Sequence, residues 1–226
     1  PIARPAAVAG WTVLTRKLAR TFLFDARDEA WPRRSTRRRL ANYERQLEQL
    51  GAVRFRHVRG GEWSGAVLDE LAAIEAASWV GTGTDGTGAK FLTDAKRSGW
   101  IDLLADPVLA EALSATILSV GGKPAAFSFD LICGAMQYGI ASSYDQQFAA
   151  FRPGKIVTAW QLERAREAGV TTIDLGAGDS GYKREMGAVP GPEILDLLIV
   201  RNRPAASLLQ LRWGAESQVA REAYLA

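Results

Sequence analysis

The stretch SATILSVGGKPAAFSFDLICGAMQYGIASS, residues 114–143, contains three apolar, strand-like runs in immediate succession. The runs cover residues 114–120, 124–132 and 136–143, and short glycine-containing connections separate them. Strand-like runs joined in this way are typical of hairpins. The stretch therefore predicts three consecutive antiparallel strands.

A helix and a further strand follow this stretch. Residues 154–168 are predicted to be helical and end at Gly169, and the β-branched run 170–175 comes next. A helix between two strands of one sheet predicts a right-handed parallel crossover. With a last strand at 194–200 and a terminal helix from Pro204 onward, the pattern indicates an α/β fold with a mixed, α+β type of sheet.

The chain before residue 114 is predicted to be mostly helical, with a helix from about Trp31 that ends at Gly51 and a strand at 53–58. Further helices are expected at 64–79 and 90–112, the latter interrupted near Gly99 and Pro107. Residues 1–30 contain only two short strand-like pieces, at 11–14 and 21–24. We therefore expect residues 1–30 to be the remnant of a preceding unit or a linker, and residues 31–226 to form one domain.

Composition excludes several classes of protein. With 47% hydrophobic and 23% charged residues among 226, the chain has an ordinary globular profile. No apolar run approaches the roughly 20 residues of a membrane span and no signal segment is present, which indicates a cytoplasmic protein. The single cysteine, Cys133, is expected to be buried, and the single histidine, His57, predicts no metal site.

Five arginines crowd the start of the first predicted helix: Arg33, Arg34, Arg37, Arg38 and Arg39. Charge runs are usually solvated faces. However, positive charge at a helix N-terminus opposes the helix dipole, so contact with tRNA or another anionic partner is the alternative interpretation.

Two glycine-rich segments suggest nucleotide sites. In residues 81–88 the spacing of Gly83 and Gly88 fits a phosphate-binding loop, but Ala89 replaces the required lysine and a helix precedes the loop. Residues 174–181 satisfy G-x-G-x-x-G and resemble a motif of S-adenosylmethionine-dependent methyltransferases. Glycines and prolines at 187–192 break the helix that this motif must open, so a dinucleotide or S-adenosylmethionine site is only the alternative.

A third segment, Phe151-Arg152-Pro153-Gly154-Lys155-Ile156, leads from a strand into a helix. Helix N-termini expose unpaired amides and suit a pyrophosphate. Gly154 lets a ligand approach the backbone, and Arg152 and Lys155 add positive charge. An ordinary capped helix is the alternative.

The order of these elements resembles the GNAT acyltransferase fold. More narrowly, it resembles the branch of the CelD-type proteins of cellulose biosynthesis, which is related to the FemAB peptidyltransferases. The residues that carry the resemblance are Gly122-Lys123-Pro124-Ala125-Ala126, Ser143-Tyr144-Asp145, Arg152-Pro153-Gly154, Gly169, Ile173-Asp174-Leu175-Gly176, Gly178 and Tyr182-Lys183, with Leu47, Gly51 and Val53 in the basic helix and the strand after it. The resemblance covers roughly residues 30 to 200.

The resemblance implies an acyltransferase that moves an acyl group, such as acetyl, from acyl-CoA. The pyrophosphate would lie on the amides around Gly154 to Ile156, and the pantetheine between the strand ending near Ser143 and the strand starting near Thr171. The common GNAT pattern, Arg/Gln-x-x-Gly-x-Gly/Ala, is changed here to a single glycine with a proline. Aminoacyl-tRNA, used by FemAB relatives, is therefore the alternative donor, and a non-catalytic binding module is the third possibility.

Direct attack by an amine or hydroxyl of a small-molecule or glycan-linked acceptor requires a base and an acid. Asp145 and Asp174 are the candidate bases, and Tyr144 and Tyr182 could protonate the departing thiolate. Lys183, in the Tyr-Lys pair, is expected to hold an anionic acceptor. For each residue, an ordinary structural role is the alternative.

Overall fold

The computed structural model describes residues 12–178 and 181–213. Trp11 of the first strand-like piece, Asp179 and Ser180 of the glycine-rich motif, and the predicted terminal helix beyond residue 213 lie outside the described residues. The helices and strands follow one another as β1 (Thr12–Asp25), α1 (Arg34–Glu48), β2 (Val53–Arg59), η1 (Gly60–Glu62), α2 (Gly65–Ala77), α3 (Trp79–Gly83), α4 (Asp94–Leu104), α5 (Pro107–Ala112), β3 (Leu113–Val120), β4 (Lys123–Cys133), β5 (Met136–Tyr144), η2 (Gln146–Phe151), α6 (Pro153–Glu167), β6 (Thr172–Ala177), α7 (Tyr182–Glu185) and β7 (Val189–Val200). Residues 203–213 are helical.

The chain divides into two compact units. The first, called here the central unit, comprises Phe24–Asp174 and Glu185–Gly187. The second, the hairpin unit, contains the described residues up to Leu23, Leu175–Arg184 and those from Ala188 onward.

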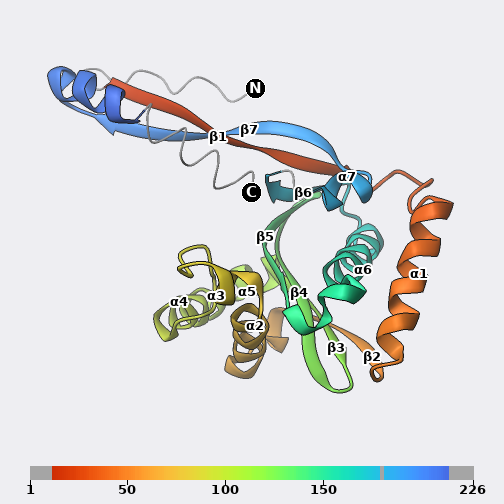
Figure 1. The fold of residues 1–226 in the computed structure, drawn as a ribbon. Coiled ribbons are helices and arrows are strands. Elements are labelled where there is room, and N and C mark those ends of the chain that lie inside the picture. Colours follow the sequence, from red (N-terminus) through yellow and green to blue (C-terminus); the bar gives the residue numbers. More distant parts are fainter. Residues whose placement is uncertain (1–11, 179–180, 214–226) are drawn as a thin grey trace. The chain divides into compact units, whose positions relative to one another are not determined.

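The central unit is built on a sheet with the strand order β2-β3-β4-β5-β6 (Figure 1). Neighbours are antiparallel from β2 to β5, which confirms the three predicted hairpin strands. β5 and β6 are parallel and are joined through α6, as the crossover rule requires. This mixed sheet with one parallel pair is the GNAT-like arrangement that the order of elements predicted.

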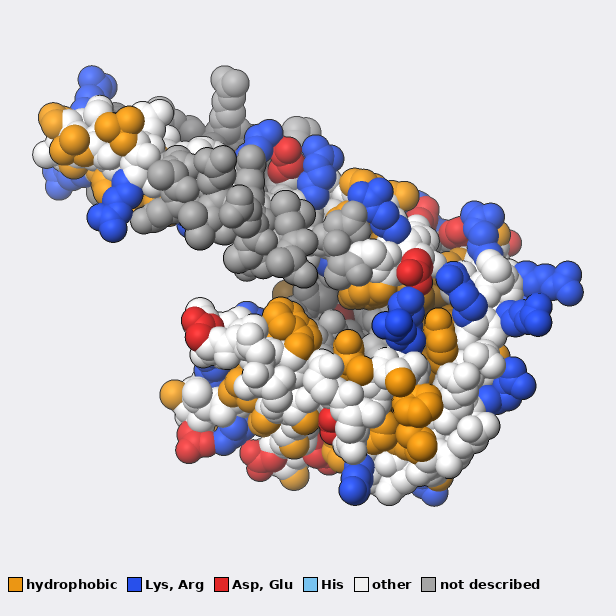
Figure 2. Space-filling model, viewed as in Figure 1, with side chains coloured by type: hydrophobic (Ala, Val, Ile, Leu, Met, Phe, Trp, Pro, Cys, Tyr) orange, Lys and Arg blue, Asp and Glu red, His pale blue; other side chains and the backbone are white. Residues whose placement is uncertain are grey.

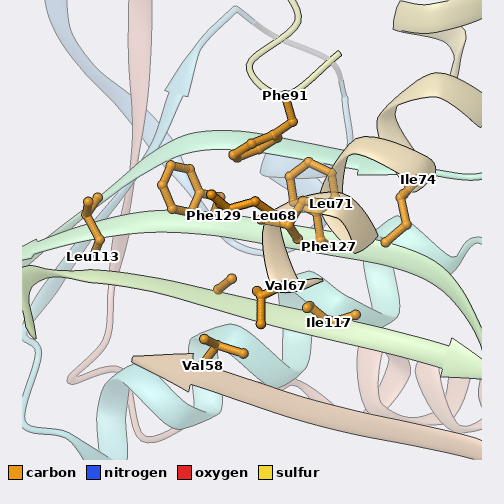
Figure 3. Packing of buried hydrophobic residues seen from close by; sticks show 11 residues of the cluster. Val58, Val67, Leu68, Leu71, Ile74, Phe91, Leu113, Ile117, Phe127 and Phe129 are labelled. Carbon is orange, nitrogen blue, oxygen red and sulfur yellow. The ribbon is translucent and has the colours of Figure 1, made fainter. Parts of the chain in front are cut away.

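Helices cover both faces of this sheet (Figure 1). Because side chains alternate along a strand, Phe127 and Phe129 of β4 point to the face under α2, where they pack with Leu68, Leu71 and Phe91 (Figure 3). Ala126 of the same strand lies on the other face, in a cluster that includes residues of α1 and α6. Burying each large apolar side chain contributes about 1.5–3 kcal/mol, so these two layers hold α6 and α2 against the sheet.

The hairpin unit contains the long antiparallel pair β1 and β7, in register from Thr12↔Val200 to Leu23↔Val189. Its strand order is β6-β1-β7, with β6 shared at the boundary between the units. The sequence predicted two short strands before residue 25, whereas the structure has one continuous strand. The division of the chain at residue 30 stays a prediction.

Three local expectations were wrong. The interruption expected near Gly99 does not occur, because Gly99 lies inside α4, whereas the one expected near Pro107 is confirmed: the helical region breaks at Ala105 and Asp106, and Asp106 caps α5 through the amides of Val108 and Leu109. Cys133 is exposed, since it is the last residue of β4 and precedes a turn. The first part of the 81–88 loop belongs to the helix α3. In the described part of the chain, no helix is long and apolar enough to cross a membrane.

Candidate active site

The start of α6 lies beside the end of β5. Arg152 adopts a left-handed conformation, with φ of 55°, and Pro153 then begins the helix. This conformation costs a non-glycine residue about 1–2 kcal/mol, so packing must hold the bend in place. A Cβ atom on Gly154 would lie 3.1 Å from Cδ1 of Tyr144, so any side chain at this position would press on the tyrosine ring where it meets the first turn.

The amides of this turn are partly used within the chain. The amide of Lys155 donates to the carbonyl of Arg152 at 3.0 Å, and the amide of Ile156 donates to the same oxygen at 3.4 Å. Among the described residues, Gly154 therefore carries the first-turn amide that a ligand can use. The side chain of Ile156 is buried in the cluster beneath the helix and anchors the turn, and the part of its amide in donor binding stays a prediction.

Positive charge gathers at this helix start. Lys155 forms an ion pair with Glu185, and Arg39 of α1 lies 3.9 Å from the same carboxylate. The hydrogen bond from Lys155 lowers the pKa of Glu185, and the charges of Arg39 and Arg152 lower it further. Three cationic side chains, from α1, from the residue before α6 and from the first turn of α6, thus lie near one carboxylate. The sequence signalled Arg152 and Lys155 but not Glu185, which lies 30 residues further along the chain.

One edge of β5 pairs with a neighbouring strand over only a short part of its length. The parallel ladder between β5 and β6 has three pairs and ends at Tyr138↔Asp174 within the described residues. On the other side, the pairing with β4 is shifted between Phe129↔Ala141 and Asp130↔Gly139, which leaves Ile140 as a bulge. A bulge redirects backbone groups and often lies beside an active site.

The predicted catalytic residues differ in their hydrogen bonds, their burial and the elements that carry them. Asp145 caps η2, accepting a hydrogen bond from the amide of Gln147 at 2.9 Å, so its carboxylate has a structural use. Asp174 is only 8% exposed and lies where the β5–β6 ladder ends. Tyr144 contacts the first turn of α6, and Tyr182 begins α7. Their catalytic roles stay predictions.

Lys183 lies in an environment that the sequence did not predict. It is buried, and its ammonium donates to the carbonyls of Gly176, Ala177 and Gly178 at 2.7–3.0 Å. It also lies 5.8 Å from the ring centre of Phe22. These contacts give Lys183 a structural role in holding the glycine-rich turn, and its role towards an acceptor stays a prediction.

A buried polar network lies in the sheet beneath α6. Asp130 of β4 is fully buried, accepts a hydrogen bond from the Ser128 hydroxyl at 2.9 Å and one from Nε2 of Gln161 in α6 at 3.2 Å. Burial raises the pKa of Asp130 to about 7, against the opposing effect of hydrogen bonds from Ser128 and Gln137. The signal in the sequence was the single carboxylate in a mostly apolar strand.

The arginine cluster lies on the exposed side of α1, where Figure 2 shows a group of basic side chains. Arg33 lies 4.0 Å from Asp28, and Arg37 donates to the carbonyl of Pro32. His57 is half-buried against Trp160, and burial lowers its pKa. No cluster of three potential metal ligands occurs in the described ranges.

The sequence matches the family model of the acetyltransferase (GNAT) domain over residues 34–184, more than half of the chain. The chain therefore belongs to the GNAT acetyltransferase family, in its CelD-like branch. This match covers most of the central unit together with Leu175–Arg184 and confirms the family resemblance, while the link to cellulose has no support from it. No curated protein matches the chain.

Solved structures share the fold at low sequence identity. They include the C-terminal domain (DUF2156) of a protein assigned as a lysylphosphatidylglycerol synthetase from Agrobacterium fabrum, with 15% identity, a TM-score of 0.56, and coverage of 88% of this chain and 65% of that chain. The L-PGS of Bacillus licheniformis has 14% identity, a TM-score of 0.56, and coverage of 93% and 67%. FemX has 13% identity, a TM-score of 0.58, and coverage of 84% and 64%. The chain thus spans about two thirds of the length of these structures, and the likeness shows the fold alone.

Proposed function

We propose that the chain transfers an acyl group from acyl-CoA to an amine or hydroxyl, with the donor pyrophosphate bound at the start of α6. The observation that carries this proposal is the convergence of the Gly154 amide with Arg39, Arg152 and Lys155 beside the end of β5. A helix N-terminus with added cations suits a diphosphate because both the amides and the side chains attract negative charge.

The pantetheine arm fits the uncovered edge of β5. Beyond Tyr138, β5 extends to Tyr144 without a ladder to β6 in the described residues, and this stretch leads to the first turn of α6. Pantetheine is an extended chain with two amides, so it can pair with an exposed strand edge as an added strand does. The thioester would then lie near the bulge at Ile140.

The reaction needs one proton to leave the nucleophile and one to reach the thiolate. The acceptor nitrogen or oxygen attacks the thioester carbonyl, the new N–C or O–C bond forms, and the C–S bond breaks as CoA leaves. Asp174 is the preferred base because it lies where the β5–β6 ladder ends, beside the uncovered edge of β5, and Asp145, whose carboxylate caps η2, is the second candidate. Tyr144, next to the first turn of α6, is the preferred acid.

Calorimetric titration with acetyl-CoA tests the donor site. Lys155→Ala is expected to weaken binding roughly tenfold to a hundredfold, since a charge-assisted hydrogen bond contributes about 1.5–3 kcal/mol. Arg164→Ala removes a cation from the last turn of the same helix and is the matched control, with unchanged affinity expected. Glu185→Gln removes the carboxylate that competes for Lys155 and is expected to tighten binding.

Parallel titration with S-adenosylmethionine separates this function from the alternatives. Heat from S-adenosylmethionine alone would favour the glycine-rich motif as the ligand site. Heat from neither compound would favour a non-catalytic binding module. Either result would overturn the acyl-CoA proposal.

Aminoacyl-tRNA is a second candidate donor, and the exposed arginines of α1 favour it. Arg39 extends this basic face to the start of α6, which links the arginine cluster to the proposed donor site. Binding through several phosphates would weaken steeply with salt. Failure of tRNA to bind at low salt would leave the cluster as a solvated helix face.

A further inference from the structure

The hairpin unit exposes a row of apolar side chains on one face of β7. Leu195, Leu197 and Ile199 are 39%, 44% and 56% exposed, whereas the residues between them are partly covered. Arg16 of β1 lies on the opposite face, where its guanidinium is 3.9 Å from the ring centre of Trp213 in the helical segment. That segment therefore covers one face of the hairpin and leaves the row on the other.

The row lies on an edge strand that can accept another strand. In the described part of the chain, β7 ends the strand order and pairs only with β1. The six pairs from Thr12↔Val200 to Lys17↔Leu195 are regular, and both register shifts lie nearer the other end of β1. Long, regular, apolar edges are sites of intermolecular pairing.

Proline limits the part of this edge that can pair. Pro190 and Pro192 lack an amide hydrogen, so they block strand addition at the beginning of β7. The unobstructed stretch runs from Glu193 to Val200, followed by Arg201, and its centre is Leu197.

A two-fold axis at Leu197 gives a complementary antiparallel register. Leu197 would lie opposite the partner subunit's Leu197, and Leu195 opposite the partner subunit's Ile199. On the same face, Glu193, which already pairs with Lys17 and Arg20 of β1, would lie opposite the partner subunit's Arg201, so an acid meets a base at each end of the apolar row.

We propose that β7 is a dimerisation edge, at which two copies of this chain pair antiparallel about Leu197 to form a continuous sheet across β1, β7 and their symmetry mates. Such a contact is isologous, which means that the same surface of both copies takes part. Each copy's β7 edge is then paired with that of the other copy, so no β7 edge is left for a third copy. The proposal is independent of the donor site.

Sedimentation equilibrium of the full chain tests the assembly. A reversible dimer is expected, and Leu197→Lys should raise its dissociation constant at least tenfold, because two ammonium groups would meet at the axis. Leu208→Lys is the matched control: Leu208 is also exposed in the hairpin unit but lies outside β7, and its variant should dimerise normally. A monomer at all concentrations, open-ended aggregation, or equal effects of the two variants would overturn the proposal.

Cysteine cross-linking tests the register in a Cys133→Ser background. Leu197→Cys should form a disulfide-linked dimer under mild oxidation, because only the residue on the axis faces its own copy. The single variant Leu195→Cys should form far less cross-linked dimer. The double variant with Leu195→Cys and Ile199→Cys should form it efficiently again, because the two cysteines face each other across the axis. Cross-linking of Leu195→Cys alone as efficiently as Leu197→Cys would contradict the two-fold register. So would the absence of a Leu197→Cys cross-link.

Discussion

Replacing Asp130 by Asn removes a buried titratable group without changing its shape. The carboxylate lies on the α6 side of the sheet, hydrogen-bonded to Ser128 and Gln161. An Asn oxygen can still accept from the Gln161 amide, and its amide can donate to the Ser128 hydroxyl. The substitution therefore keeps the hydrogen bonds with Ser128 and Gln161 and removes the cost of burying a charge.

The sign and size of the effect follow from the raised pKa of Asp130. Its pKa moves from 3.8 to about 7, so between these values the folded protein keeps a proton that the unfolded chain has lost. The stabilisation from Asp130 is therefore complete below about pH 4 and is lost as the pH rises to about 7. About three pKa units at about 1.4 kcal/mol each correspond to about 4 kcal/mol, of which about 3 kcal/mol falls between pH 4.5 and 8.5.

Urea unfolding of the wild-type protein and Asp130→Asn across this pH range measures the effect. The variant is expected to gain about 3 kcal/mol relative to the wild type between pH 4.5 and 8.5. Asp102→Asn, at an exposed position of α4, serves as the control and should follow the wild-type profile. A difference between Asp130→Asn and the wild type that does not change with pH would refute the reasoning.

Three further predictions follow from the described contacts. Lys183→Ala should lower the free energy of unfolding by about 2–4 kcal/mol in chemical denaturation, because three carbonyls lose a charged donor; unchanged stability would restore the acceptor-binding interpretation. Gly154→Val should weaken acetyl-CoA binding at least tenfold by displacing the Tyr144 ring, whereas Gly99→Ala, where a Cβ meets open space, should not; equal affinities would remove Gly154 from the site. Cys133 should react with a thiol reagent in the folded protein at a rate close to that of the unfolded chain, and strong protection would contradict its exposure.

The sequence alone determined the order of the central elements. Hairpins at residues 114–143 and the crossover after them follow from local patterns, namely short apolar runs, glycine turns and a proline at the helix start. The candidate helix N-terminus, with Arg152, Gly154 and Lys155, could be predicted for the same reason, because all its groups lie within four consecutive residues.

Only the tertiary structure decided the features that join distant parts of the chain. The pairing of β1 with β7 links residues nearly 190 positions apart, and the ion pair of Lys155 with Glu185 spans 30. The use of Asp145 as a cap and of Lys183 as a donor to three carbonyls likewise depends on backbone geometry, which a residue's type does not specify. Local sequence patterns set secondary structure because their interactions are short in sequence, whereas charge partners and burial arise only when packing brings remote segments together.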